Sequence, residues 1–250
     1  RAGKVAAINR SMEYVKTPYV VFCDANTFLN PDCIKEIVKH YADDKIGAVA
    51  GEKKIVDLSA DQNTAGAGEG LYWKYESFLT RIDARFYTVV GAAGELFSIR
   101  TKLFEPVANN ILLDDFMISM KICRRGYRVM YEPKAFASEA PSMSMRDEQK
   151  RKIRISAGGF QSVFLLKDLL NIFKYGKLSF LYISHSVLRC IICPVLLTIA
   201  FATDLYIYMN GKENVYLISL ILQLFFYIAA LTGWLFALQN RKIKALYIPY

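Results

Sequence analysis

The chain has 250 residues, of which 54% are hydrophobic, and it carries a formal net charge of +9. This length fits one domain of ordinary size with an appendage. The five cysteines are odd in number and form no disulfide framework, which argues against a disulfide-stabilised secreted domain. The sequence opens at Arg1 without a signal peptide, and a helical pattern begins at once, so we expect it to lack an upstream part of the protein.

Basic and apolar residues are unevenly distributed along the chain. Residues up to about 161 have the composition of a soluble domain, whereas the chain is largely apolar from residue 178 onward. Lys and Arg gather at residues 124–125, 146–154 and 241–244, near or between the apolar stretches. This placement favours phosphates and lipid headgroups over nucleic acid as partners, and the sequence contains no nucleic-acid recognition motif.

The first fifty residues predict alternating helices and strands. Apolar residues at helical spacing predict helices at residues 3–15 and 31–41, and apolar runs predict buried strands at 19–23 and 46–50. This alternation predicts an α/β domain with a mostly parallel sheet and flanking helices. Ligands bind such sheets outside the carboxyl ends of the strands.

The next eighty residues continue the α/β pattern. A Gly- and Ala-rich stretch at residues 60–70 predicts a loop, and residues 71–86 are amphipathic and aromatic. The remaining expectations are a tight turn at residues 91–94, strands at 95–99 and 127–131, and a helix at 114–125. Asp114 and Asp115 fall in the first turn of that helix, where the helix dipole favours anionic groups.

The last third of the chain predicts a membrane-bound part. Residues 146–170, basic first and apolar later, suit a helix at a membrane surface. Two segments, at about 187–208 and 215–238, are long enough to cross a hydrocarbon core, which needs about 20 residues, and a third span is possible from near residue 246. We therefore divide the chain into a domain at residues 1–165 and a membrane-associated part at 166–250.

The distribution of positive charge around these spans predicts their orientation. Lysines and arginines flank the outer ends of the two spans, while the turn between them holds one lysine. The positive-inside rule then places both outer ends, and the soluble domain, in the cytoplasm. Arg189 and Asp204 lie within the first span, near its ends, and either reach the membrane interface or line a polar path through the bundle.

Asp24 and Asn26 suggest a metal site at the end of the first predicted strand. They follow the apolar run 19–23 and precede a turn, so they stand at the strand's carboxyl end. Mg²⁺ and Mn²⁺ prefer oxygen ligands, and Mg²⁺ commonly takes only one or two from protein while phosphates and water supply the rest. Asp24 and Asn26 therefore suit a cation bound to a diphosphate; the alternative is an ordinary acid at a strand end.

Four more side chains suit the chemistry of a diphosphate leaving group. Arg151 and Arg154, three residues apart on one helix face, match phosphate oxygens, and Lys4 adds positive charge. Asp115 suits a base that takes a proton from an incoming hydroxyl. One base and a direct displacement would invert the reacting carbon. The alternatives are lipid-facing arginines and aspartates that merely begin a helix.

With these residues in place, the chain resembles the family 2 membrane glycosyltransferases, which include cellulose, chitin and hyaluronan synthases and many bacterial exopolysaccharide enzymes. Five ordered motifs carry the resemblance: Gly3-Lys4 with Asn9, Asp24-Ala25-Asn26 (DxD), the glycine turn at Gly91 and Gly94, Asp114-Asp115 (ED), and the segment Arg151 to Ile155 (QxxRW). Three positions depart from the family pattern, since Asn26 replaces the second acid of DxD, and Arg151 and Ile155 replace Gln and Trp.

The resemblance implies a GT-A fold whose first part is missing, followed by an interfacial helix and transmembrane helices. It implies an inverting transfer of a sugar from a nucleotide diphosphate sugar, a UDP-sugar by expectation, to a glycan or lipid acceptor at the cytoplasmic membrane face. Asp115 would be the base, and Gly91 and Gly94 would lie on the acceptor side. The donor would contact Lys4, Asp24, Asp114, Arg151 and Arg154, and Asp24 and Asn26 would bind Mg²⁺ or Mn²⁺. The alternative is an inactive membrane subunit that binds nucleotide sugar or scaffolds polysaccharide export.

Overall fold

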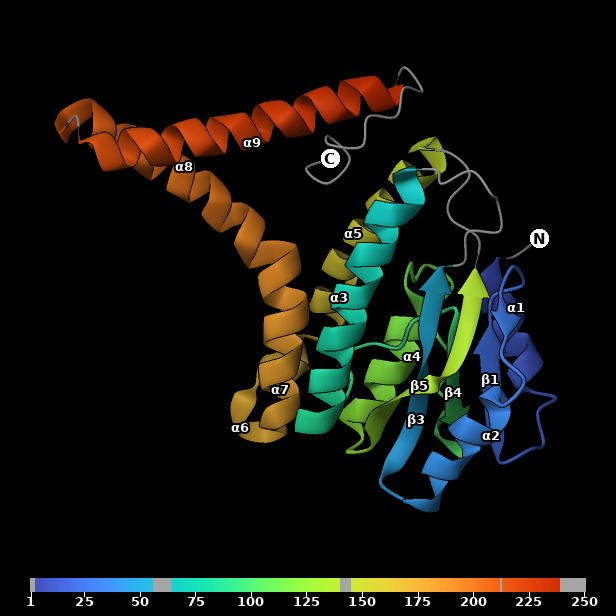
Figure 1. Cartoon of the computed structure of the whole chain (residues 1–250). Coiled ribbons are helices and arrows are strands. Elements are labelled where there is room, and N and C mark those ends of the chain that lie inside the picture. Colours follow the sequence, from blue (N-terminus) through green and yellow to red (C-terminus); the bar gives the residue numbers. More distant parts are fainter. Residues whose placement is uncertain (1–2, 56–63, 140–144, 212, 239–250) are drawn as a thin grey trace.

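The computed structural model describes residues 3–55, 64–139, 145–211 and 213–238 (Figure 1). Its centre is a sheet with the strand order β1-β4-β3-β5-β2. The strands are β1 (Tyr19–Cys23), β2 (Phe28–Leu29), β3 (Ile46–Ile55), β4 (Leu96–Arg100) and β5 (Arg128–Glu139). With helices packed on both faces, the α/β class with flanking helices is confirmed.

The sheet is mixed, so the expectation of a mostly parallel sheet is wrong in this respect. Among the described strands only β3 and β5 pair in parallel, whereas β4 is antiparallel to both β1 and β3, and β2 is antiparallel to β5. The helix–strand alternation does not reveal that β4 inserts between β1 and β3. Strands β1, β3 and β5 still share one direction, so their carboxyl ends meet at one edge, where β4 begins.

The helices up to residue 165 cover both faces of this sheet. They are α1 (Lys4–Met12), α2 (Cys33–Val38) with the 3₁₀ turn η1 (Lys39–Ala42), α3 (Thr64–Phe86), α4 (Asp114–Arg124) and α5 (Met145–Leu165); a short 3₁₀ turn, η2 (Thr101–Leu103), follows β4. The loop predicted at 60–70 is wrong for residues 64–70, which are helical in α3. Alanine favours helix there, and the segment extends the amphipathic helix that follows.

Alternation along the strands separates the core into two layers. Ala48 and Ala50 of β3 face the larger layer, whereas Val49 faces the smaller one with Ile37 of α2. The larger layer contains residues of α1, α3 and α4, including the fully buried Ile118 and Ile122. Burial of such side chains contributes about 1.5–3 kcal/mol each, so helix α4, which begins with the two aspartates, is firmly held against the sheet.

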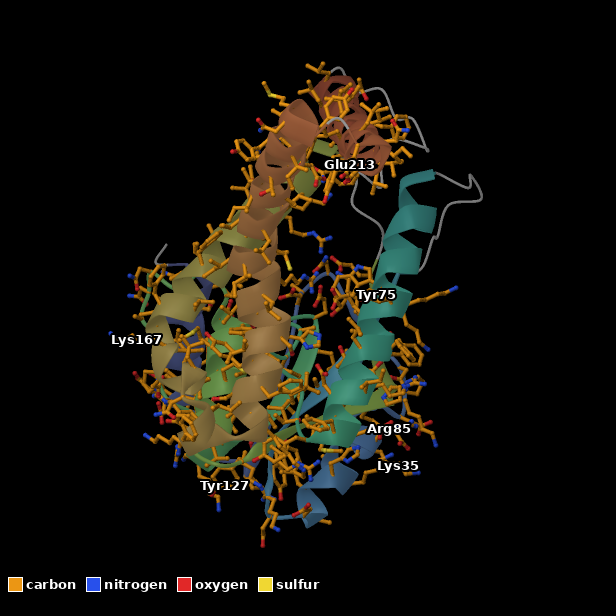
Figure 2. All side chains as sticks on the ribbon, turned by 90° about the vertical axis from the view of Figure 1, so that its left-hand side faces the viewer. Lys35, Tyr75, Arg85, Tyr127, Lys167 and Glu213 are labelled. Atoms are coloured by element: carbon orange, nitrogen blue, oxygen red, sulfur yellow. The ribbon has the colours of Figure 1, made fainter. Side chains whose placement is uncertain are left out.

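The C-terminal part begins inside this core and leaves it as one long helix. After η3 (Lys167–Leu170) and α6 (Ile172–Tyr175), the helix runs through α7 (Lys177–Tyr182), a π-helical stretch, η4 (Ile183–Ile192), and α8 (Cys193–Gly211) (Figures 1 and 2). Helix α9 (Asn214–Leu238) packs against α8 near their connection and then diverges from it (Figure 1). The larger core layer includes Leu169, Leu178 and Tyr182, so it continues past residue 165. The division of the chain at that residue stays a prediction.

Two of these helices are long and apolar enough to cross a membrane. In the described part of the chain they are Lys177–Gly211 and Asn214–Gly233. The predicted spans at 187–208 and 215–238 overlap them, but the first begins within η4, six residues before α8. The possible third span near residue 246 and the basic residues 241–244 lie outside the described residues.

The two charges predicted within the first span have protein partners. Arg189 lies in η4 and pairs with Glu76 at 2.6 Å, so it holds the first part of the long helix against α3. Neither predicted alternative, a reach to the membrane interface or a polar path, includes this ion pair. Asp204 of α8 accepts hydrogen bonds from Ser219 Oγ at 2.6 Å and Gln223 Nε2 at 3.0 Å, both on α9, and so joins the two apolar helices.

Candidate functional site

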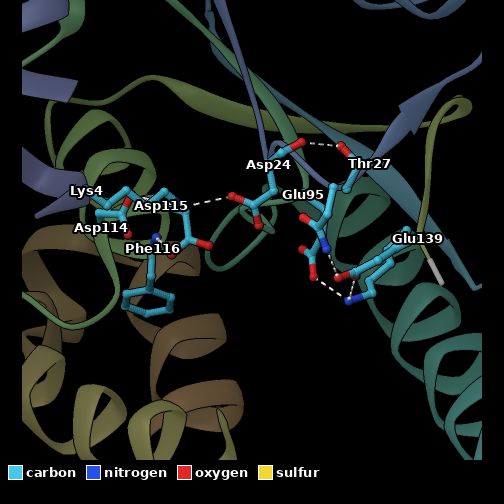
Figure 3. Close-up of polar contacts among 10 residues, drawn as sticks. Lys4, Asp24, Thr27, Glu95, Asp114, Asp115, Phe116 and Glu139 are labelled. Atoms are coloured by element: carbon cyan, nitrogen blue, oxygen red, sulfur yellow. Dashed lines mark hydrogen bonds and ion pairs between the residues drawn. The ribbon is translucent and has the colours of Figure 1, made fainter. Parts of the chain in front are cut away.

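One ammonium group joins two of the acids that the sequence singles out. Lys4 Nζ lies 3.1 Å from Asp24 Oδ1 and 3.5 Å from Asp114 Oδ2 (Figure 3). Asp24 follows β1, Lys4 begins α1 and Asp114 begins α4, so three segments far apart in the chain meet here. Partial burial lowers the pKa of Lys4, but the carboxylates of Asp114 and Asp24 outweigh it and raise that pKa overall.

Helix α1 is fixed against the segment that precedes α4. Asn9 Nδ2 donates to Val107 O at 2.7 Å, and Val107 N donates to Asn9 Oδ1 at 3.1 Å. The side-chain amide of Asn9 thus pairs with both backbone groups of Val107, as the backbone of a neighbouring β-strand would. It sets the position of α1, and hence of Lys4, relative to the acids. The sequence motif that contains Asn9 therefore has a positioning role in this structure.

Asp115 sits against the glycine turn. Its Oδ1 accepts a hydrogen bond from Phe116 N at 2.7 Å, while a Cβ added to Gly94 would lie 2.6 Å from its Oδ2. Gly91 has a φ of +80°, and a Cβ there would lie 2.3 Å from the ring of Phe116. Only glycines allow the turn to approach the first turn of α4 this closely, so the turn packs directly against Asp115 and helps to fix its position.

The surroundings of Asp115 raise its pKa to about 6. Burial is the largest cause, and the nearby charges of Asp114 and Glu95 act in the same direction. The Phe116 N–H and the charge of Lys4 oppose them. A carboxyl group with a pKa near the working pH is suited to accept a proton in a reaction.

A second polar cluster lies on the other side of Asp24, and the sequence analysis did not single out two of its members, Lys53 and Glu139. Lys53 Nζ of β3 lies 2.5 Å from Glu95 Oε1 and 2.7 Å from Glu139 Oε2, and Asn26 Nδ2 donates to Glu139 Oε1 at 2.6 Å (Figure 3). The predicted strand at 127–131 ends too early to suggest Glu139. The observed β5 runs on to residue 139 and brings this acid to the edge where Asp24 lies.

The arginine pair lies on the face of α5 that adjoins the start of α4. A Cβ added to Gly158 would meet Leu113 Cγ at 2.5 Å, and Gln161 Oε1 accepts from Leu112 N at 3.0 Å. Arg154 is one turn before Gly158 on the same helix face, and Arg151 lies a further turn away. Their predicted role at the phosphates stays a prediction.

The oxygen groups present fit a divalent cation that also binds phosphate. Within the described residues no group of three or more His, Cys, Asp or Glu side chains is arranged to hold a metal. Asp24, half-buried at the strand end, and the amide of Asn26 would offer one carboxylate and one neutral oxygen. Two protein ligands suffice for Mg²⁺ when phosphates and water complete the shell, and Lys4 would then share Asp24 with the cation.

Comparison with known proteins identifies the family. The family model described as "Glycosyl transferase family group 2" matches residues 19–238. The chain belongs to this family. The match includes Asp24 after β1, Asp114 and Asp115 of α4, helix α5 and both apolar helices, and it begins after α1, the helix that carries Lys4.

Several curated relatives are poly-β-1,6-N-acetyl-D-glucosamine synthases. The protein of Staphylococcus aureus (strain COL) is 27% identical over 181 residues, which cover 69% of this chain and 42% of the relative. The protein of Staphylococcus epidermidis is 26% identical over 224 residues, which cover 86% of this chain and 52% of the relative. This glycosyl transferase family member therefore spans about half the length of the curated relatives it matches.

A solved structure shares the fold. It is the mannosyltransferase PcManGT from Pyrobaculum calidifontis in complex with GDP-Man and Mn²⁺, with a TM-score of 0.54 and 18% identity over 89% of this chain and 64% of that one. At this identity the likeness concerns the fold alone, and it confirms the GT-A-like architecture predicted from the sequence.

Proposed function

We propose that this protein is an inverting glycosyltransferase that moves a sugar from a nucleotide diphosphate sugar to a hydroxyl acceptor at the cytoplasmic face of the membrane. The observation that carries the proposal is the convergence on Lys4, which contacts Asp24 and Asp114, with Asp115 next in α4. An acid suited to donor binding and an acid suited to proton transfer thus lie in one site, as direct transfer requires.

Asp115 is the proposed base. It takes the proton of the acceptor hydroxyl while the hydroxyl oxygen forms a bond to the sugar carbon and the bond from that carbon to the diphosphate breaks. Attack from the side opposite the leaving group inverts the configuration at this carbon. The glycine turn at Gly91 and Gly94 supports Asp115 on the acceptor side.

The donor side must stabilise negative charge on the diphosphate as it leaves. We assign donor binding to Lys4, Asp24 and Asp114, with the guanidinium groups of Arg151 and Arg154 on the phosphates. Asp114 Oδ2 is buried and has Lys4 as an ion-pair partner but no hydrogen-bond donor among the described residues, so it can accept a hydrogen bond from a donor hydroxyl. Mg²⁺ or Mn²⁺ held by Asp24 and Asn26 would supply further positive charge to the diphosphate.

The relatives guide the choice of donor and acceptor. Their name concerns polymers of N-acetyl-D-glucosamine, which supports a UDP-sugar as donor, a glycan as acceptor, and a role in polysaccharide synthesis. The two apolar helices support a membrane location with lipid as a partner.

The test is transfer by the full-length protein in membranes, with UDP-N-acetylglucosamine, Mn²⁺ and a glycan acceptor. We expect UDP release that depends on the acceptor, and we expect Asp115→Asn to lower it by about 10²–10⁴-fold while UDP binding persists. Glu13→Gln, at an exposed acid after α1, is the matched control. Full turnover in Asp115→Asn would overturn the assignment of the base.

The alternative, an inactive subunit that binds nucleotide sugar or scaffolds export, is favoured by Asn26 and Ile155, which replace an acid and a Trp of the family pattern. It predicts UDP binding without UDP release when each of several sugar donors is supplied.

A further inference from the structure

Asn26, which stands where the family pattern has a second acid, is held by a carboxylate from another strand. Its Nδ2 donates to Glu139 Oε1 at 2.6 Å, across a sequence separation of 113 residues. Asn26 follows β1, whereas Glu139 ends β5, and β4 and β3 lie between these strands in the sheet. The contact therefore exists only in the folded domain, where it connects the two carboxyl ends.

The chemistry of the two groups fixes which way the amide faces. An ionised carboxylate only accepts hydrogen bonds, so it can pair with the NH₂ of an amide but not with its oxygen. The amide of Asn26 therefore turns its Nδ2 toward the Glu139 carboxylate and its Oδ1 away from that carboxylate. An aspartate at position 26 would bring a second negative charge to this short distance, which is unfavourable.

Glu139 is itself held in place by a buried cation. The Lys53 side chain is 4% exposed, and its Nζ lies 2.7 Å from Glu139 Oε2 and 2.5 Å from Glu95 Oε1. It also lies over the ring of Trp73, 4.6 Å from the centroid. A charge this deeply buried requires such partners, so Lys53 and both carboxylates form a fixed frame behind Asn26.

We propose that Glu139, supported by Lys53, is a positioning residue that orients the carbonyl oxygen of Asn26 as a ligand for a divalent cation shared with Asp24. The pair of Asn26 and Glu139 then replaces the second acid of the family pattern. This inference rests on the proposed function, because it assigns a role within the same donor site.

The test is a titration of the full-length protein, in detergent, with Mn²⁺ alone, in which free Mn²⁺ is measured by electron paramagnetic resonance. Asp24→Asn shows which part of the binding belongs to this site. We expect Glu139→Gln to weaken that part by about tenfold, as the loss of an outer-shell partner typically does, because a glutamine can present either end of its amide to Asn26. Glu132→Gln is the matched control, since Glu132 lies on the same strand and pairs with Lys39 at 2.8 Å.

A double-mutant cycle separates orientation from simple charge. If Glu139 acts through Asn26, then Glu139→Gln has no further effect on Mn²⁺ affinity in an Asn26→Ala background. Three results would each overturn the proposal. They are an equal loss of Mn²⁺ affinity from Glu139→Gln in the wild-type and Asn26→Ala backgrounds, an unchanged Mn²⁺ affinity in Glu139→Gln, and Mn²⁺ binding that does not depend on Asp24. UDP release is measured separately, so a protein that passes this cycle but transfers no sugar refutes the proposed function and leaves the positioning role standing.

Discussion

Asp115 shows how single residues set the conditions under which the proposed reaction runs. Its carboxyl group is shielded from water and lies near one cation and two further acids, and its pKa is raised to about 6. A base must be unprotonated to work, so the fraction of active enzyme falls as the pH drops below this value.

This residue predicts an acid limb in the pH profile. We expect kcat/KM for transfer, at saturating Mn²⁺, to fall about tenfold per pH unit below pH 6, because a single proton blocks the base. Glu95→Gln removes one negative charge that raises the pKa of Asp115. The acid limb of the pH profile of Glu95→Gln should therefore lie at lower pH than the acid limb of the wild type.

The control for this pH profile is Glu105→Gln, an acid that pairs instead with Arg125 at 3.6 Å. If the acid limb shifts equally in Glu95→Gln and Glu105→Gln, or shifts in neither, the result would contradict the electrostatic link between Glu95 and Asp115.

At the scale of elements, the contact between the glycine turn and the first turn of α4 supports the site. Gly91 and Gly126 both have positive φ, at +80° and +89°. A Cβ at Gly126 would meet nothing within 4 Å, whereas one at Gly91 would overlap Phe116. The two glycines therefore share a backbone requirement and differ in what surrounds them.

This difference predicts distinct effects of two alanine substitutions. Gly126→Ala should lower the free energy of unfolding by about 1–2 kcal/mol, the cost of a left-handed conformation, and leave transfer unchanged. Gly91→Ala should destabilise the protein further and lower transfer by up to about 100-fold, because it displaces the helix start that carries Asp115. Thermal unfolding measures the change in stability, and UDP release measures the change in transfer. Equal losses of activity in the two variants would argue against a role for the Gly91 turn in positioning Asp115.

Asp204 links α8 to α9 through hydrogen bonds from two α9 side chains. Asp204→Ala removes the acceptor for Ser219 and Gln223. We expect it to weaken the association of the two helices by about 0.6–2 kcal/mol, as measured by unfolding in increasing SDS. Thr203→Ala is the neighbouring control, because Thr203 Oγ1 donates only within its own helix, to Ile199 O. A loss as large in the control would refute the link.

At the scale of the whole molecule, the cysteines report on orientation in the membrane. Cys23 is exposed beside the site, whereas Cys33 and Cys123 are buried. If the soluble domain faces the cytoplasm, a membrane-impermeant maleimide should label Cys23 in inverted vesicles but not in intact cells. The Cys23→Ser variant identifies the labelled residue, and labelling from outside would reverse the proposed orientation.

The sequence could predict the site where a short segment determines the geometry. Strand β1 and the start of α4 follow from local patterns, so the sequence could single out Asp24 and Asp114, which the structure brings together at Lys4, and the neighbouring Asp115. The antiparallel insertion of β4 and the length of β5 depend on pairing between distant strands, which local propensity does not encode. Lys53 and Glu139 went unnoticed for that reason, and the partner of Arg189 depends on packing between α3 and η4.

The long helix Lys177–Gly211 has its lower end packed in the soluble domain, where Leu178 and Tyr182 are buried, and its upper end is apolar and exposed. If α8 and α9 cross a membrane as proposed, this helix sets how far the candidate site stands from the lipid and in which direction the site faces. One inserted helical residue would lift the domain by about 1.5 Å and turn it by about 100°. Under the same proposal, an acceptor anchored in the bilayer would need a linker between its anchor and its reacting hydroxyl group that spans this distance, so the helix length would limit which acceptors can react.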